Sequence, residues 1–546
     1  MPKTARVARR PAVNLHLDEK TLDGLFAEFD ERPLPGAAIG ISVHGKPVYR
    51  RGFGLANTDR SERLTPATRM RIGSATKHFA CLACLLLCED GRASIDDPIA
   101  KHLPELHPAS RDVTLRQLMG NISGLRDAMD VNWQFSGATQ RVTSEEILAL
   151  YRTIDDVNAP PATTWIYNNG GFLLLSTAIE RIAGKSLEEV LRERLFAPIG
   201  MPDTHLCRYN PPDSPGNAGL YMPNERGGYT PPNFGTALAG EGGLVSTVDD
   251  MLRWLANFDK PVVGTAATWN LMRSPQTLRN GSSTCYSLGL MTGHYRGIEW
   301  LYHPGGLMGG SAQVLKVPSL GLDMAIMANR HDLSAIVLAN KVLDTCLGGL
   351  DPAVEAPEAP TVQGLFRSPT TGRFVQFSPS ADLQYNEWSR QQIASIDGFD
   401  LPVESDTHGT LRPMRGLDYQ KLTLTLTGNR HRPSALRLNN FGNVDDLAPQ
   451  KPPEHSDVRV IAGTYRSRQT DTAVTIQESD TGPELVSKGR FGTVTYALTC
   501  LTNAVWRARP KHQHAMTWGG TLSFRNGATA FDFSSWQTWS LPFVKD

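Results

Sequence analysis

The chain has 546 residues, of which 40% are hydrophobic and 20% charged, and its 55 Lys and Arg residues balance 55 Asp and Glu residues. This length exceeds a single hydrophobic core and predicts two to four domains at roughly 100–200 residues each. A net charge of zero creates no overall field that attracts nucleic acid or an anionic membrane, so we expect neither as a partner. No uncharged apolar run approaches the roughly 18 residues of a transmembrane helix.

The N-terminus and the cysteines indicate a cytoplasmic protein. Residues 1–14 form a basic arm without the apolar stretch of a secretory signal. Three of the seven cysteines, Cys81, Cys84 and Cys88, lie in one apolar segment without a histidine cluster. Buried thiols are therefore expected in place of a disulfide framework or a zinc site. We expect no metal and no organic cofactor.

The first 350 residues combine helical and strand patterns. A helix is predicted over 15–29, and two strands joined by a tight turn follow at 36–43 and 47–54. Residues 71–89 begin with small and polar side chains and continue as an apolar tract, which predicts a central helix. The connection 208–239 is long and rich in Pro, Gly and Asn, so we expect it to border a functional site. Further helices are expected at 113–119, 144–152, 170–184, 187–195 and 335–347, and strands at 286–292, 298–303, 311–317 and 322–327.

Two linkers divide the rest of the chain. Residues 351–361 are rich in Pro, Ala and Glu, and 450–453 contain two prolines. The stretch after each linker shows strand-like alternation and begins with a similar fragment, GLFRS at 364–368 and GTYRS at 463–467. This pattern predicts a duplicated antiparallel module that closes as a barrel of about eight strands. We therefore expect three domains, at 1–350, 362–450 and 456–546.

The start of the predicted central helix carries a candidate nucleophile. Ser74 and Lys77 are three residues apart and share one face of the first helical turn. Burial at the positive end of a helix lowers the pKa of a lysine, and such a lysine can activate a neighbouring serine hydroxyl. The alternative is a solvated helix start in which the spacing arises by chance.

Two other short motifs carry groups that such a serine needs. Tyr167 opens the run Tyr-Asn-Asn before a predicted helix, where a tyrosine can serve as an acid or base, or simply be a partly buried residue. His303 opens the run His-Pro-Gly-Gly at the end of a predicted strand. Gly305 and Gly306 allow a substrate backbone to lie against that edge, with amides directed at an oxyanion, although a plain turn is the alternative.

Together, in this order, the three motifs resemble those of the penicillin-recognising serine hydrolases, which include class C β-lactamases, DD-peptidases and related esterases and aminopeptidases. The matching residues are Ser74-Ala75-Thr76-Lys77, Tyr167-Asn168-Asn169 and His303-Pro304-Gly305, the last in place of the Lys-Thr-Gly of β-lactamases. The resemblance spans the first domain. It implies an α/β (α+β) β-lactamase/DD-peptidase-like fold in which helices flank an antiparallel sheet.

The resemblance also implies a role for each matched residue. Ser74 attacks a carbonyl to form an acyl-enzyme, while Lys77 and Tyr167 transfer its proton, with a lysine cation or a tyrosine phenolate as alternative resting forms. Asn169 holds Lys77 and the substrate amide, and His303 lines the site and helps to pass a proton to the leaving group. The backbone amides of Ser74 and Gly306 form the oxyanion hole.

The two C-terminal modules resemble those of the D-stereospecific aminopeptidases in this superfamily, in which a loop of the last barrel reaches the active site. The corresponding loop here is 507–518, from which Lys511 and His514 are candidate substrate-binding residues. This loop contains no carboxylate for a substrate α-amine. Either another acid binds the amine, or the substrate has no free amine. The resemblance also suggests a homodimer.

The predicted function is a D-stereospecific aminopeptidase that releases N-terminal D-amino acids from small peptides, amides or esters. The alternative within the fold is an esterase or amidase, or a DD-peptidase-like hydrolase, with a different acyl group. An inactive module for protein interaction is disfavoured because none of the four catalytic candidates is missing. β-Lactamase activity is not expected of a cytoplasmic protein that lacks Lys-Thr-Gly.

Overall fold

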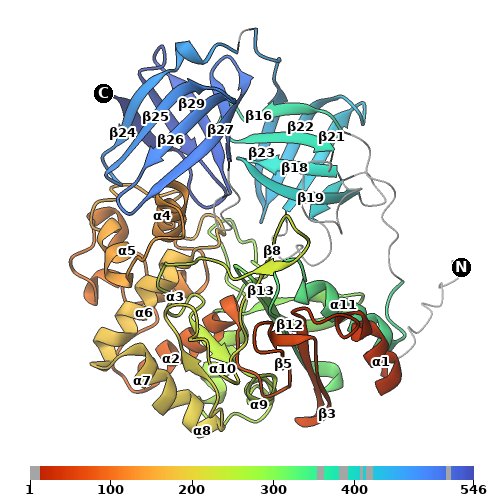
Figure 1. Cartoon of the computed structure of the whole chain (residues 1–546). Coiled ribbons are helices and arrows are strands. Elements are labelled where there is room, and N and C mark those ends of the chain that lie inside the picture. The colour runs from red at the N-terminus through yellow and green to blue at the C-terminus, as the bar shows by residue number, and fades with distance from the viewer. Residues whose placement is uncertain are drawn as a thin grey trace, which may run out of the picture.

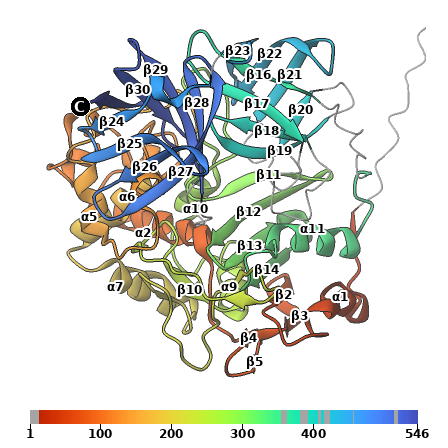
Figure 2. The same cartoon turned by 45° about the horizontal axis from the view of Figure 1, so that its top comes forward.

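The computed structural model describes residues 13–352, 362–379, 392–405, 410–413, 422–454, 456–511 and 518–546 of the chain. Its first part, residues 13–352, is a sheet with flanking helices, here called the sheet domain. Two closed barrels follow, the first formed by strands between 364 and 449 and the second by strands between 463 and 545. Both barrels lie on the same side of the sheet domain, next to each other (Figures 1 and 2). The predicted fold class is confirmed.

The sheet domain is built on six antiparallel strands in the order β11-β12-β13-β14-β2-β3. Pairing of β14 with β2 brings the N-terminal hairpin of β2 and β3 against a strand close to the end of the domain. The strands β14 and β2 are buried almost throughout because helices cover both of their faces. One face packs against α9, and the other packs against α11, next to α1. The strands are β11 (Met291–Tyr295), β12 (Ile298–Leu307), β13 (Gly310–Val317), β14 (Leu322–Ala328), β2 (Ala37–Val43) and β3 (Lys46–Phe53); the helices are α1 (Glu19–Phe26), α9 (Val248–Ala256) and α11 (Ala335–Cys346).

The predicted central helix is present as α2 (Lys77–Glu89), which follows a 3-10 turn, η2 (Gly73–Thr76). Its residues from Lys77 to Leu87 are all buried, as expected for a helix that is apolar on every side. Helices α6, α7 and α10 pack around it. The surrounding helices are α3 (Leu115–Met119), α5 (Ser144–Leu150), α6 (Asn169–Ala183), α7 (Leu187–Leu191) and α10 (Ala266–Arg273).

Three helices of eight or more residues are absent from the predicted elements, and one strand is displaced. Helix α4 (Ala128–Ser136) has nine residues and all are buried, so it shows no amphipathic period in the sequence. Helices α9 and α10 each begin after a capping threonine, and this helix-start signal can be found in the sequence. The strand expected at 286–292 begins only at Met291, because a turn with a Ser287 N to Leu290 O hydrogen bond of 2.7 Å precedes it.

Each C-terminal barrel closes from eight strands, which agrees with the predicted duplication. The two matching fragments are the first strands, β16 and β24, and each starts with a glycine at strongly positive φ, 128° at Gly364 and 138° at Gly463. The aromatic residue two positions later, Phe366 or Tyr465, is buried in its own barrel. The first barrel consists of β16 (Gly364–Arg367), β17 (Phe374–Pro379), β18 (Gln392–Ile396), β19 (Phe399–Ser405), β20 (Leu411–Pro413), β21 (Leu422–Gly428), β22 (Pro433–Asn440) and β23 (Asn443–Pro449). The second consists of β24 (Gly463–Ser467), β25 (Thr472–Ser479), β26 (Gly482–Lys488), β27 (Thr493–Thr502), β28 (Val505–Pro510), β29 (Gly520–Arg525), β30 (Ala530–Ser534) and β31 (Leu541–Lys545).

Part of the segment expected to be a loop at 507–518 is a strand of the second barrel, and its side chains contact the first barrel. Residues 507–510 belong to β28, and the Arg507 guanidinium donates to Asp400 of the first barrel at 2.5 Å. Arg509 contacts the same carboxylate at 3.5 Å. Phe399 of the first barrel stacks on Trp536 of the second with ring centroids 4.9 Å apart. The prediction of a loop from residue 507 is therefore wrong, because strand pairing continues to Pro510; residues 512–517 lie outside the described residues.

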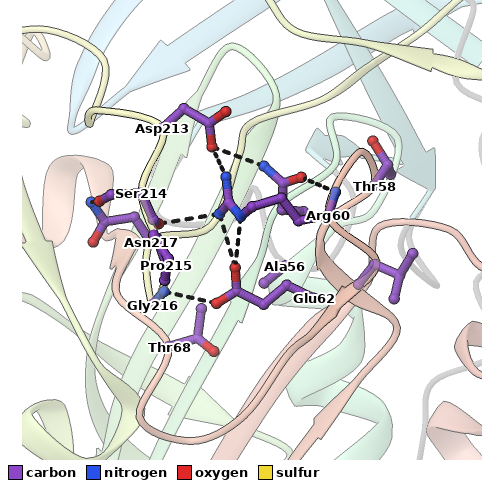
Figure 3. Close-up of polar contacts among 12 residues, drawn as sticks. Ala56, Thr58, Arg60, Glu62, Thr68, Asp213, Ser214, Pro215, Gly216 and Asn217 are labelled. Carbon is purple, nitrogen blue, oxygen red and sulfur yellow. Dashed lines mark hydrogen bonds and ion pairs between the residues drawn. The ribbon is translucent and has the colours of Figure 1, made fainter.

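The long connection 208–239 is fixed along the sheet domain by a cluster of polar contacts (Figure 3). Arg60 forms ion pairs with Glu62 and Asp213 and donates to Ser214 O at 3.1 Å. Glu62 in turn accepts from the Gly216 amide at 2.7 Å. Farther along, Tyr221 N donates to Gly309 O at 3.1 Å, in the turn between β12 and β13. The connection therefore reaches the strand that carries His303 and the two glycines.

Candidate active site

Ser74 and Lys77 lie together at the start of α2. Because η2 leads into α2 without a break, the two side chains share one face, and Lys77 Nζ lies 3.1 Å from Ser74 Oγ. The same Nζ lies 2.9 Å from Asn169 Oδ1 and 2.6 Å from the main-chain oxygen of Glu241. These three acceptors can take the three protons of an ammonium. The predicted grouping of the serine, the lysine and the asparagine is present in the structure.

The lysine is in an environment that disfavours its charge. Its side chain is completely buried, and this burial lowers the pKa of Lys77 to about 7 from its usual 10.5. The nearby carboxylates of Glu241 and Asp127 oppose the shift without reversing it. Near neutral pH a substantial fraction of Lys77 is therefore a neutral amine. A neutral amine has a lone pair that can accept the Ser74 proton.

Tyr167 lies beside the lysine on the segment that leads into α6. Lys77 Nζ is 4.6 Å from the centroid of the Tyr167 ring, and the tyrosine is half-buried. The next residue, Asn168, caps α6 through a 2.7 Å hydrogen bond from the Gly171 amide to its Oδ1. The cap explains why the helix begins at Asn169, which places the Asn169 side chain over Lys77. One short segment thus supplies both Tyr167 and Asn169 to the site.

His303 is deeper than expected. Its side chain is 1% exposed, Nδ1 donates to Pro304 O at 2.7 Å, and Nε2 is 3.0 Å from the Tyr286 hydroxyl. Burial, with smaller contributions from His78 and Lys77, holds the pKa of His303 well below its usual range, so the imidazole is neutral. A neutral ring that donates through Nδ1 accepts from Tyr286 through Nε2. His303 is therefore buried beside Tyr167, with ring centroids 6.3 Å apart, and both of its ring nitrogens are engaged inside the protein.

The two glycines after His303 lie against the backbone that precedes Ser74. A Cβ added at Gly305 would lie 1.9 Å from Ile72 O, so no larger residue fits there without moving one of the two segments. A Cβ added at Gly73 would lie 2.9 Å from the Gly306 amide nitrogen. Gly306 itself is exposed, and a Cβ there would meet nothing within 4 Å. The amides of Ser74 and Gly306 therefore belong to two adjacent backbone segments that border open space.

Two buried carboxylates act on the site and were missed in the sequence. Asp127 accepts from the Asn169 amide at 2.6 Å and from the Gly170 amide at 2.9 Å, which fixes the first turn of α6. Burial raises the pKa of Asp127 to about 6 although these amides oppose the shift. Glu241 is 2% exposed, and its Oε1 accepts from the Ala239 amide at 2.6 Å. Asp127 also caps α4, so the helix-start signal in the sequence could have identified this residue.

The barrels contribute contacts that no local sequence signal announces. Gln537, in the second barrel, donates to the main-chain oxygen of Tyr167 at 2.9 Å. Phe441, in the first barrel, packs against Trp165 with ring centroids 5.3 Å apart. Lys511 was expected to bind substrate, but its ammonium pairs with Glu484 at 2.5 Å and with Thr481 at 2.8 Å, both in the second barrel. The other candidate from this loop, His514, lies outside the described residues.

Among the described residues, no group of three or more His, Cys, Asp or Glu side chains is arranged to hold a metal ion. No helix in this part of the chain is both long enough and apolar enough to cross a membrane.

The comparisons with known proteins agree with this geometry. The Beta-lactamase family model matches residues 22–345, which cover the whole of the site in the sheet domain. The chain belongs to the beta-lactamase family. The resemblance inferred from the three motifs is confirmed, and the protein is an enzyme of the serine hydrolase type.

Relatives and solved structures extend the match across the barrels. A D-aminopeptidase from Cereibacter sphaeroides is 28% identical over 489 residues, which covers 86% of this chain and 88% of that protein. The octameric penicillin-binding protein homologue from Pyrococcus abyssi has a TM-score of 0.55 at 18% identity and covers 97% of this chain and 100% of its own. The D-amino acid amidase from Ochrobactrum anthropi, solved with D-phenylalanine, has a TM-score of 0.51 at 22% identity, covering 60% of this chain and 98% of that one. The two structures support the fold of this family member.

Proposed function

We propose that the protein is a D-stereospecific aminopeptidase that releases N-terminal D-amino acids from small peptides, amides or esters through an acyl-enzyme on Ser74. The observation that carries the proposal is the contact of Ser74 Oγ with a fully buried Lys77 that also bonds to Asn169. A serine beside an amine of lowered pKa is an activated nucleophile. The D-aminopeptidase relative, which spans both barrels as well as the sheet domain, supplies the substrate class.

The reaction begins with the proton of Ser74. Neutral Lys77 accepts this proton across the 3.1 Å contact while Ser74 Oγ bonds to the carbonyl carbon of the substrate. The carbonyl oxygen becomes negative and is stabilised by the amides of Ser74 and Gly306. Lys77 and Tyr167 then pass the proton to the leaving nitrogen, and the bond between this nitrogen and the carbonyl carbon breaks. Water then attacks the carbonyl carbon of the acyl-enzyme, the same residues transfer the protons in the opposite direction, and the bond to Ser74 Oγ breaks. This frees the D-amino acid and Ser74.

The remaining residues orient this machinery. Asn169 accepts from Lys77 and so fixes the direction of the ammonium, leaving its side-chain amide close to the substrate. His303 and Tyr286 form a buried hydrogen-bonded pair whose rings lie 6.3 and 6.4 Å from that of Tyr167, which supports a positioning role for His303. Gly305 lets β12 approach the segment before Ser74, and the exposed Gly306 leaves room for a substrate backbone along β12.

One observation favours the alternative of an esterase or amidase with a different acyl group. The two carboxylates that act on Lys77, Asp127 and Glu241, are 0% and 2% exposed, so neither is open to an approaching substrate ammonium. The amine of a D-aminoacyl substrate thus needs another acceptor, whereas a neutral acyl group needs none. The two functions differ in their requirement for a free α-amine.

We also propose a cytoplasmic location. In the described part of the chain, which includes all seven cysteines, no disulfide joins any two of them, and this supports a reducing compartment. The homodimer stays a prediction of the family resemblance. The proposed partner is a small-molecule or short-peptide substrate.

The test is hydrolysis of D-alanine and L-alanine p-nitroanilides in parallel, with p-nitrophenyl acetate beside them and Ser74→Ala as the blank. We expect turnover of the D-anilide alone, lost in the variant. Turnover of the acetate without either anilide would show an esterase instead. Equal turnover of the D- and L-anilides would contradict the proposed stereospecificity.

A further inference from the structure

One short segment of the second barrel, residues 535–540 between β30 and β31, carries many of its contacts with the sheet domain. The hydroxyls of Ser535 and Thr538 both donate to Asp130 on α4, at 2.9 and 2.7 Å. Asn158 donates to Gln537 O at 2.7 Å and accepts from the Trp539 amide at 2.9 Å. All of these groups except Trp539 and Asn158 are fully or almost fully buried. The segment is therefore held rigidly against α4 and the loop that follows α5.

The same segment is fixed from a third direction by Arg126. This guanidinium is 2% exposed and donates to the main-chain oxygens of Trp539 and Ser540, the latter at 3.4 Å. It also pairs with Asp156 at 2.6 Å. Because Arg126 directly precedes Asp127, which fixes the start of α6, the barrel segment and the candidate active site share one support.

From this rigid segment, the Gln537 side chain reaches the active-site main chain. Its Nε2 donates to Tyr167 O at 2.9 Å, and the glutamine is 6% exposed. The two following residues are held from the sheet domain, Asn168 N by Asn121 Oδ1 at 3.1 Å and Asn169 N by Asp127 Oδ2 at 2.6 Å. Main-chain groups of three successive residues are thus each bonded to a side chain, and only the first of these side chains comes from a barrel.

We propose that Gln537 is a positioning residue for the reaction at Ser74, and that through it the second barrel completes the active site. Its amide fixes the peptide that carries the Tyr167 ring, which lies 4.6 Å from Lys77 Nζ at its centroid. Gln537 acts through Tyr167 and does not touch the substrate. Without this bond the barrel still packs on α4, but the Tyr167 main chain loses one of its anchors. A small misplacement of a proton-transfer group slows the chemical step more than it weakens binding.

The inference rests on the proposed nucleophile, so its test uses a reagent that needs no particular acyl group. A fluorophosphonate phosphonylates Ser74, forming a bond from Oγ to phosphorus with loss of fluoride, and this covalent step stands in for acylation by a substrate. Following it over a range of reagent concentrations separates its first-order rate constant from the binding constant. Gln537→Met keeps the length of the side chain and removes the donor. Ser487→Ala is the matched control, because Ser487 Oγ also donates from the second barrel to a main-chain oxygen, that of Phe135, at 2.8 Å.

We expect Gln537→Met to lower the rate constant of acylation by about tenfold with the binding constant unchanged. Ser487→Ala should lower the Tm by about as much as Gln537→Met does and leave acylation at the wild-type rate. Gln537→Glu adds a test by pH: its protonated carboxyl can donate to Tyr167 O, and its carboxylate cannot. The ratio of its rate to that of Gln537→Met should therefore fall as pH rises.

The inference is overturned if Gln537→Met acylates at the wild-type rate, or if Ser487→Ala slows acylation equally. A ratio of the Glu to the Met variant that stays constant with pH also contradicts it. If Gln537→Met does not fold, the pH dependence of Gln537→Glu relative to the wild type decides the question. Failure of the wild type itself to be labelled refutes the proposed function, which is a distinguishable result.

Discussion

The two barrels have the same number of strands and begin with similar short fragments, yet they contact the sheet domain in different ways. The second barrel packs on α4 and bonds to Tyr167 itself through Gln537 (Figure 1). The first barrel reaches the chain just upstream, where Phe441 packs on Trp165 and Asn443 donates to Thr163 O at 2.8 Å. The second barrel therefore holds the active-site residue Tyr167, and the first barrel holds the segment that precedes Tyr167 in the chain.

The difference lies in the loops, because each barrel is a closed set of eight strands. The first barrel uses the turn between β22 and β23, whereas the second uses the segment between β30 and β31 and the ends of β26 and β27. The two barrels thus share an architecture and differ in the loops that contact the sheet domain. Changes at segment 535–540 of the second barrel and at the residues that hold it should affect both stability and chemistry, whereas changes at the first barrel should affect stability alone.

The largest effect is expected from Asp130→Ala at the second barrel. Asp130 is fully buried and accepts from Ser535, Thr538 and Gln134, so its loss leaves three buried donors without their acceptor. We expect the free energy of unfolding to fall by about 3 kcal/mol and acylation of Ser74 to slow. Urea unfolding and fluorophosphonate labelling measure the two quantities. An unchanged labelling rate in the folded variant would show that the second barrel is only a structural support.

The pH dependence of acylation tests the role of Lys77, and a change in the first barrel should leave it unaltered. Because the neutral form of Lys77 accepts the serine proton and its pKa is about 7, the wild-type rate should fall by about tenfold per pH unit below that value and level off above it. Substitution at Phe441 should leave the midpoint in place. A wild-type rate that is flat between about pH 5 and 8 would contradict the role of Lys77.

Phe441→Leu tests the apolar contact of the first barrel. Phe441 is 3% exposed, and the smaller side chain loses part of its packing on Trp165. We expect a loss of about 1.5 kcal/mol in the free energy of unfolding, measured with urea. The acylation rate of the folded variant should remain within about twofold of the wild type. A slowing as large as that of Gln537→Met would remove the distinction between the barrels.

The smallest effect is expected from Asn443→Ala in the first barrel. At this partly exposed position the change removes the hydrogen bond that Asn443 donates to Thr163 O at 2.8 Å and the longer one that it accepts from Asn280 at 3.3 Å. The free energy of unfolding should fall by about 0.5–1 kcal/mol, and the kinetics of labelling should not change. A kinetic effect without a change in Tm would indicate that the first barrel also positions Tyr167.

The sequence predicted the parts of this molecule that depend on local patterns. The apolar tract of α2, the strands β2, β13 and β14 and the paired barrel fragments have periodic or repeated signals. The grouping of Ser74, Lys77, Tyr167 and Asn169 followed from motifs whose order resembles a known family. Helix α4 could not be found in this way, because contacts made in the folded molecule bury all of its faces.

Side-chain placement at the site was less predictable for the same reason. His303 was expected to line the site, and the structure buries its ring beside Tyr167, where Tyr286 provides a hydrogen-bond partner. Lys511 was expected near the substrate, but the adjacent Glu484 holds it within the barrel. The contact of Gln537 with Tyr167 joins residues 370 positions apart, and no periodicity in the sequence encodes such a contact.

The most direct test of the account is the site of covalent modification by a fluorophosphonate. Mass spectrometry of the intact protein, followed by peptide mapping, should show one adduct on the peptide that contains Ser74. The adduct should be absent from Ser74→Ala and should form much more slowly in Lys77→Met. An adduct at another residue, or no adduct on the folded wild-type protein, would contradict the assignment of Ser74 as the nucleophile.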